Sequence, residues 1–123
     1  FNIGIFEAAK AAGVRALVAV NPMDERTTPF CRWVNGKIIR MERIERQLGR
    51  FRRAVADQSR EAVIEAWPFI SMSKKAMKAA KENIAQDRSP GARVTDAEVF
   101  RRFFASVGLP PYHWRCRTRT RPI

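Results

Sequence analysis

Four arginines near the end of the chain alternate with smaller side chains, and this period of two constrains the fold more than any other feature. The arginines are Arg115, Arg117, Arg119 and Arg121, and the residues between them are Cys116, Thr118 and Thr120. Successive side chains of a β-strand point to opposite faces. The pattern therefore predicts a strand with one face of arginine and one face of cysteine and threonine. A face made only of cations indicates a polyanionic partner.

Two further strands are predicted in the first third of the chain. Residues 14–20 form an apolar run rich in β-branched side chains, and residues 37–41 follow a turn signal that ends at Gly36. A short helix is predicted over residues 2–12. The first and last thirds of the chain are thus expected to share a small sheet.

The middle of the chain is predicted to be helical. An amphipathic stripe with steps of four, three and four residues joins Ile44, Leu48, Phe51 and Val55. Later helices are expected to begin after the capping residues Ser59, Ser73 and Thr95, the last of which opens a capping box with Glu98.

These elements predict an α+β fold with a small antiparallel sheet, formed by the N-terminal and C-terminal thirds, and a helical insertion between them. At 123 residues the chain is expected to be one domain. In this interpretation residues 1–41 and 94–123 make the α+β core, and residues 42–93 make the insertion.

Net charge separates this chain from an ordinary globular domain. It carries 24 Lys and Arg against 12 Asp and Glu, a net charge of +12. Such a balance favours nucleic acid, an anionic surface or an acidic protein as partner, unless the domain belongs to a larger, balanced protein. We expect the polyanion-facing surface to combine the tail arginines with four lysines of the middle helices. These lysines are Lys74, Lys75, Lys78 and Lys81.

Neither end of the chain indicates a membrane protein. The longest apolar run is too short to span a bilayer, so no membrane partner is expected. Residues 1–13 carry charges and indicate a helix rather than a signal peptide. Because the sequence opens on Phe1, it is expected to be a piece of something larger.

Two segments at opposite ends of the sequence share a motif with a known family. The matching residues are Asp24, Arg26, Thr27, Pro29, Cys31, Gly36, Lys37, Pro110, Pro111, His113, Cys116, Arg117 and Pro122. With them the chain resembles the phage Mu F-like family of minor head proteins, the head morphogenesis domain. The resemblance covers the two ends, about half of the chain, and leaves the insertion out.

The resemblance implies a non-enzymatic minor capsid protein at the portal vertex, needed for head assembly or for packaging and delivery of DNA. Its partners would be portal or other capsid proteins, with DNA or RNA bound through phosphates. It would be located in the virion or in the host bacterial cytoplasm. Part of the motif would hold two loops together: Asp24, Arg26, Thr27, Cys31, Gly36, Pro111, His113 and Cys116.

The chain departs from the family pattern at three positions. Thr28 and Thr118 stand where the family has cysteines, and Trp114 stands where it has a proline. The loss of one cysteine from each segment suggests that these two positions face each other in the fold.

What remains is a set of three soft groups, Cys31, His113 and Cys116, where tetrahedral zinc binds four ligands. We expect a contact between reduced thiols without a cofactor. Zinc, with Asp24 as a possible fourth ligand, and a disulfide between the two cysteines are the alternatives.

A different function class remains open. A metal-independent ribonuclease needs an acid or base near the 2′-hydroxyl and cations around the scissile phosphate. His113, Arg115, Arg117, Lys37 and Thr118 could supply that set. The chain would then be a toxin domain of a larger secreted bacterial protein, delivered into a target cell and held by an acidic immunity protein.

Other chemistries are less compatible with the sequence. It contains no GxSxG, P-loop, HExxH or zinc-deaminase signature. A further alternative is a basic module that binds an acidic partner, such as an immunity or scaffolding protein. Aromatic side chains could stack on bases or pack across the sheet, and the candidates are Phe30, Trp33, Tyr112 and Trp114.

Overall fold

The computed structural model describes residues 2–89, 91–113 and 115–123. Its elements confirm the α+β class. In chain order they are α1 (Asn2–Ala11), β1 (Ala16–Val20), α2 (Pro29–Val34), β2 (Ile38–Arg40), α3 (Met41–Ala56), α4 (Arg60–Ala66), α5 (Lys74–Ala85), α6 (Asp96–Ser106) and β3 (Arg119–Pro122). No helix in the described ranges is long and apolar enough to cross a membrane.

The sheet joins the two ends of the chain, as the sequence predicts. Its strand order is β2-β1-β3, and both pairings are antiparallel. Leu17, on the central strand, lies opposite Ile39 on one side and Pro122 on the other. The side chains of Leu17, Ala19 and Ile39 are fully buried. Every second side chain of β1 therefore points inward, and these side chains form one side of the core.

The turn between α2 and β2 needs its glycine. Gly36 has a φ of +82°, a left-handed conformation that side chains with a Cβ rarely adopt. Its amide donates to the carbonyl of Ala19 at 2.8 Å, and the amide of Ala19 donates to the carbonyl of Lys37 at 3.0 Å. The turn thus aligns β2 with β1.

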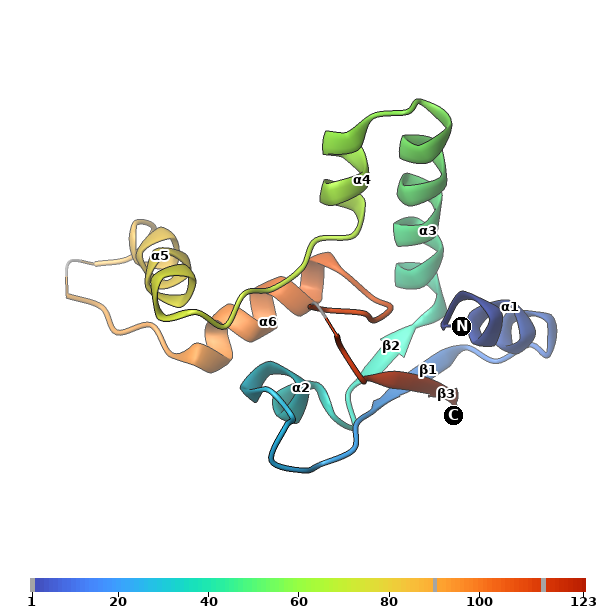
Figure 1. Cartoon of the computed structure of the whole chain (residues 1–123), viewed down its shortest axis with the longest axis horizontal. Coiled ribbons are helices and arrows are strands. Elements are labelled where there is room, and N and C mark those ends of the chain that lie inside the picture. The colour runs from blue at the N-terminus through green and yellow to red at the C-terminus, as the bar shows by residue number, and fades with distance from the viewer. Residues whose placement is uncertain (1, 90, 114) are drawn as a thin grey trace.

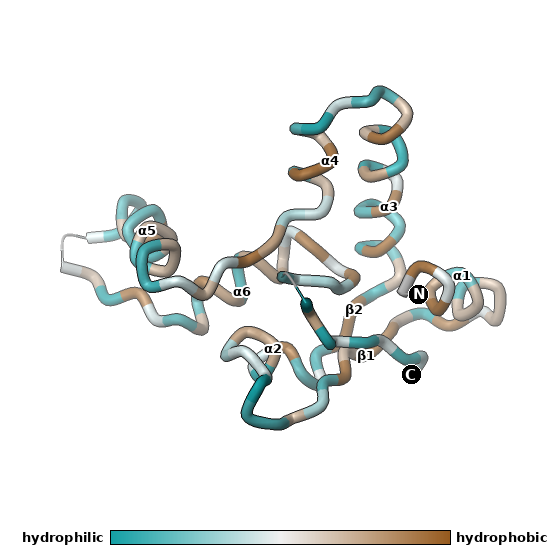
Figure 2. The backbone as a smooth tube through the Cα atoms, in the orientation of Figure 1, coloured by the Kyte–Doolittle hydropathy of each residue, from teal (hydrophilic) through white to brown (hydrophobic). Residues whose placement is uncertain are grey.

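The helices surround the sheet unevenly (Figure 1). Helices α3 and α4 pack side by side as a hairpin that projects away from the sheet, and α5 lies at the far end of the molecule against α6. Helix α3 shows alternating hydrophobic and hydrophilic bands along its length, as an amphipathic helix does (Figure 2). Ile44 and Leu48 of α3 are buried in the same core as the sheet residues. The predicted division at residue 42 therefore falls inside a helix that contributes to the shared core.

The predicted capping residues occupy their positions. Ser59, Ser73 and Thr95 each accept a hydrogen bond from an amide three residues further on, at 3.1–3.3 Å. These bonds satisfy donors that the first turn of a helix leaves without a backbone partner. The carboxylate of Glu98, the partner expected to complete the capping box, pairs with Arg88.

Two predicted details were wrong. Val55, assigned to the inward stripe of α3, is 53% exposed, and Ala54 is buried in its place. Ala54 faces α4, which packs beside the end of α3 and determines which side of the last turn is covered. The tail strand begins at Arg119 rather than Arg115, because Arg115 takes a left-handed turn with a φ of +60°.

Candidate functional site

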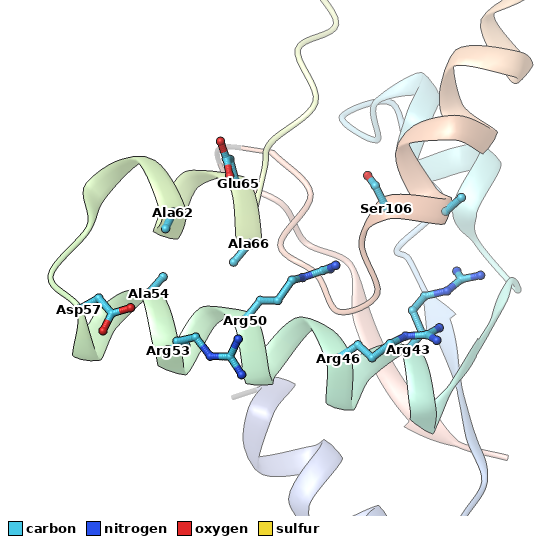
Figure 3. Close-up of a pocket in the computed structure, with 11 residues that line it drawn as sticks. Arg43, Arg46, Arg50, Arg53, Ala54, Asp57, Ala62, Glu65, Ala66 and Ser106 are labelled. Atoms are coloured by element: carbon cyan, nitrogen blue, oxygen red, sulfur yellow. The ribbon is translucent and has the colours of Figure 1, made fainter.

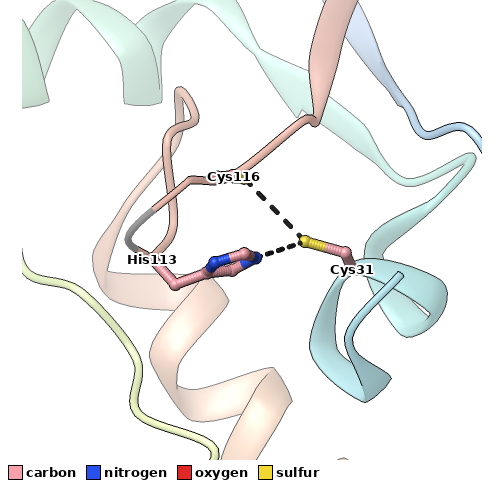
Figure 4. A group of neighbouring side chains, drawn as sticks. All are labelled: Cys31, His113 and Cys116. Atoms are coloured by element: carbon pink, nitrogen blue, oxygen red, sulfur yellow. Dashed lines mark hydrogen bonds between the residues drawn. The ribbon is translucent and has the colours of Figure 1, made fainter. Parts of the chain in front are cut away.

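The fold brings the two motif segments together around Cys31. This residue lies in α2, and its Sγ is 3.0 Å from Nε2 of His113 and 3.8 Å from Sγ of Cys116 (Figure 4). The partners are 82 and 85 residues away in the sequence. Cys31 is buried, whereas His113 and Cys116 are half-buried. The three residues predicted from the motif therefore form one cluster, named here the Cys-His-Cys cluster.

The two threonines at which the sequence departs from the resembled motif, Thr28 and Thr118, both lie against this cluster. The hydroxyl of Thr28 is 3.4 Å from Nε2 of His113, and the hydroxyl of Thr118 is 3.2 Å from Sγ of Cys31. Thr28 also caps α2 by accepting from the amide of Cys31 at 3.3 Å. The two threonines thus supply hydroxyl contacts from both motif segments.

Asn21 is a member of this site that the sequence reasoning missed. Its side-chain amide donates to the carbonyl of Cys31 at 2.7 Å, and its Oδ1 accepts from the hydroxyl of Thr118 at 2.8 Å. Its own backbone amide donates to Oδ1 of Asn35 at 2.8 Å. The Asn-Pro pair indicated only the end of a strand, which is why its role as a buried connector was not foreseen.

Each thiol in the cluster affects the ionisation of the other. The hydrogen bond from Cys31 lowers the pKa of Cys116 below the usual thiol value. The contact with Cys116 and burial raise the pKa of Cys31. Cys116 is therefore the thiol that loses its proton first, and it is also the more exposed of the two.

The cluster offers three ligand atoms to a metal. The sulfur and nitrogen atoms of Cys31, His113 and Cys116 all lie within 4.8 Å of one another. A structural zinc site takes four such ligands at about 2.0–2.3 Å. Asp24, the candidate fourth ligand, has both carboxylate oxygens bonded to Arg117. The two thiols are free, with no bond between their sulfurs.

A second set of contacts holds the loop before α2. Oδ1 of Asp24 accepts from the amide of Arg26 at 2.9 Å, and Nε of Arg32 donates to the carbonyl of Thr27 at 3.2 Å. The Arg117 guanidinium binds Asp24 through two nitrogens, at 3.0 and 2.6 Å. The bonds from Arg117, and to a smaller extent the one from the amide of Arg26, hold the pKa of Asp24 well below its usual range.

The ribonuclease candidates do not all meet at one point. His113 and Thr118 contact Cys31, and Arg117 binds Asp24. The ammonium of Lys37 lies 4.7 Å from the ring centroid of Trp33. Arg115 is exposed on its turn. The structure therefore brings together only part of the predicted catalytic set.

The predicted cationic residues form two separate surfaces. Arg119 and Arg121 are exposed on β3, next to α1, whereas α5 lies at the opposite end of the molecule (Figure 1). On α5, Lys74 and Lys78 are exposed, as is their neighbour Lys75. Lys81 is half-buried and pairs with Asp96 at 2.5 Å. The tail arginines and the α5 lysines, which the sequence predicted to meet a polyanion together, thus lie on different parts of the molecule.

The aromatic candidates for base stacking belong to the core. Phe30 and Tyr112 are fully buried, with ring centroids 5.2 Å apart. Trp33 packs against Phe100 of α6, with a centroid distance of 6.0 Å, rather than across the sheet. The remaining candidate, Trp114, lies outside the described residues.

Comparison of the chain with protein families, with curated proteins and with solved structures gives no match.

Proposed function

We propose that this chain is a domain of a phage or prophage minor head protein, acting in head assembly or in packaging and delivery of DNA at the portal vertex. The proposal includes sequence-independent contact with nucleic acid through phosphates. Its partners are portal or other capsid proteins, and its location is the virion or the host bacterial cytoplasm.

The observation that carries the proposal is that the motif residues bind one another across the whole chain. Asp24 binds Arg117 from 93 residues away, and Cys31 contacts His113 from 82 residues away. Contacts of this kind between distant segments are what a motif that holds two loops together would make, and they support a structural role for these residues. This is the role that the resemblance assigns to them.

The net charge of +12 supports the nucleic-acid part of the proposal. Exposed arginines and lysines bind phosphates by releasing counterions, and such binding weakens steeply as salt rises. Because phosphate contacts position a protein without reading bases, the domain would meet packaged DNA regardless of its sequence.

The alternative function is a toxin-type ribonuclease that uses His113. One observation favours it: a hollow of about 890 Å³ adjoins the cluster, lined in part by Cys116, Arg117 and Arg119. An RNA strand in this hollow would lie beside cations and near a histidine. The contacts of His113 with Cys31 and of Arg117 with Asp24 argue against this use.

The two functions are separated by mixing the purified chain with RNA and with duplex DNA over a salt series, scoring binding and cleavage together. The head-protein proposal expects salt-sensitive binding to both and cleavage of neither. RNA cleavage that disappears in His113→Ala, but persists in the surface variant Arg60→Ala, would replace it with the ribonuclease.

Capsid function is tested directly by co-sedimentation with an assembled portal ring. The domain is expected to sediment with the ring and to be harmless when expressed alone in bacteria. Failure to sediment, together with lethality that His113→Ala abolishes, would contradict the proposal.

A further inference from the structure

A groove lined by arginine lies on the α3–α4 hairpin, away from the Cys-His-Cys cluster and from both the tail arginines and the α5 lysines. It has a volume of about 640 Å³ and lies between α3, α4 and the last turn of α6 (Figure 3). Its charged lining consists of Arg43, Arg46, Arg50, Arg53, Asp57 and Glu65. We refer to it as the arginine groove.

The four arginines form a row because of their spacing. They are separated by three, four and three residues, which places them on one side of a helix with 3.6 residues per turn. With a rise of 1.5 Å per residue, the row from Arg43 to Arg53 is about 15 Å long. Figure 3 shows these side chains spread along α3, with α4 above one end and α6 beside the other.

The charges of this row are largely uncompensated. Within residues 2–89, 91–113 and 115–123, no carboxylate forms an ion pair with Arg46, Arg50 or Arg53. The neighbouring acid Glu45 is paired elsewhere, with Lys10 at 3.1 Å. With four cations against two carboxylates, the lining has an excess of positive charge.

One end of the row is fixed in place. Arg43 is half-buried, and its guanidinium donates to the carbonyl of Phe104 at 3.3 Å while lying 5.2 Å from the centre of the Phe104 ring. A guanidinium held in this way loses less conformational freedom when an anion binds. The other three arginines are exposed and able to follow a ligand.

We infer that the arginine groove binds the sugar-phosphate backbone of one nucleic-acid strand. Guanidinium groups bind phosphates through two parallel hydrogen bonds, which makes arginine well suited to this ligand. At a rise of 3.4 Å per nucleotide along a duplex strand, a row of about 15 Å matches about four phosphates. This inference deepens the phosphate contact of the proposed function and adds a specific site for it.

The test measures how binding of a DNA duplex depends on salt. Each lost phosphate contact lowers the slope of log K against log salt concentration by about 0.9. The variant Arg46→Gln/Arg50→Gln/Arg53→Gln is therefore expected to lower the slope by about 2–3. All three side chains are exposed and Gln is a good helix former, so the fold is retained, which circular dichroism checks.

A matched control removes three exposed arginines that do not line the groove, in Arg15→Gln/Arg40→Gln/Arg101→Gln. Its slope is expected to stay within about 1 of the original, since few of these groups would contact phosphate. A groove variant that loses no more than this control overturns the inference. If the groove variant loses binding to polyglutamate but still binds DNA as the unmodified chain does, the inference is also overturned, and the groove is assigned to an acidic protein.

The outcomes keep this inference apart from the proposed function. If the groove variant binds DNA normally while Arg119→Gln/Arg121→Gln binds weakly, the groove inference fails and the phosphate contact of the head protein stands. If the unmodified chain binds no nucleic acid, both the groove inference and the phosphate contact of the proposed function fail. Sedimentation with the portal ring then decides the assembly role alone.

Discussion

The carboxylate of Asp24 and the guanidinium of Arg117 are joined by two hydrogen bonds, of 3.0 and 2.6 Å, although 93 residues separate them in the sequence. This bridge fastens the loop before α2 to the tail that leads into β3. Both side chains are substantially exposed, so salt and solvent weaken the attraction between them. The main effect of the bridge is therefore to fix the position of the tail relative to the loop before α2, rather than to add a large stabilising energy.

The first prediction concerns this bridge. Asp24→Asn and Arg117→Gln should each lower the urea midpoint of unfolding, and the double variant should lose less than the sum, because the two changes remove one shared interaction. Unfolding curves of the four proteins at pH 7 provide the measurement. Additive losses would show that the two side chains stabilise the fold independently.

The same bridge predicts a pH dependence. Arg117 holds the pKa of Asp24 in the folded chain below its usual value of 3.8. Stability from this carboxylate is therefore fully present above pH 3.8 and is lost as the pH falls through the lower folded pKa. The difference in midpoint between the unmodified chain and Asp24→Asn should narrow below pH 3.8. A constant difference down to about pH 2 would contradict this.

A second prediction concerns Gln47, which is fully buried in α3. Its Oε1 accepts from the amides of Gly108 at 3.1 Å and Leu109 at 2.8 Å. Gln47→Met keeps the size of the side chain and removes the buried Nε2, which has no hydrogen-bond partner among the described residues, but it leaves two buried amides unpaired. The net cost should be about 1–3 kcal/mol.

Denaturant unfolding measures this loss, and the exposed Gln86→Met provides the control, with an expected change within about 0.5 kcal/mol. Equal losses in the two variants would show that the amides near Gly108 find other partners.

The third prediction is a difference in reactivity between the two thiols. Because the thiolate is the nucleophile, the lowered pKa of Cys116 and its greater exposure should make it alkylate faster than Cys31 at pH 7. Mass spectrometry of peptides after brief treatment with iodoacetamide gives both rates, and unfolding in urea should equalise them. A faster reaction at Cys31 in the folded chain would reverse the assignment.

The fourth prediction concerns metal. With three soft ligands in the Cys-His-Cys cluster and Asp24 bound to Arg117, we expect the purified chain to hold no stoichiometric zinc and to contain two titratable thiols. Elemental analysis and thiol titration in urea check both points. One zinc per chain, with a melting temperature that falls on chelation, would contradict the prediction, and a missing pair of thiols would indicate a disulfide.

The parts of the fold that followed from the sequence depend on local rules. Ser59, Ser73 and Thr95 cap helices because a side-chain oxygen can reach an amide three residues ahead, whatever surrounds it. The central strand was visible because Leu17 and Ala19 belong to an apolar run.

The features that could not be predicted from the sequence depend on which helices pack against one another in the fold. The exposure of Val55 reflects the packing of α4 beside α3, and the arginine groove exists only because that hairpin and α6 converge. The row itself was readable from the spacing of Arg46, Arg50 and Arg53, but no local rule separates a binding row from an ordinary solvated helix face.

The burial of Asn21 and Gln47 was also not predictable, since the hydrogen bonds that Asn21 and the Oε1 of Gln47 make are to groups far away in the sequence. The motif resemblance, in contrast, predicted that the two end segments meet. For this reason Cys31 and His113 could be grouped from the sequence, although 82 residues separate them.

The position of β3 at one edge of the sheet has a consequence for how the chain folds as it is made. Because β1 and β2 are close in the sequence, they can pair soon after both have left the ribosome, and the α3–α4 hairpin can form next from neighbouring residues. The second edge of β1 and the Cys-His-Cys cluster must wait for residues 113–122. During that interval β1 presents an open edge to any other strand in the cell. A chain halted just before residue 113 should therefore depend on chaperones in a way that a chain containing β3 does not.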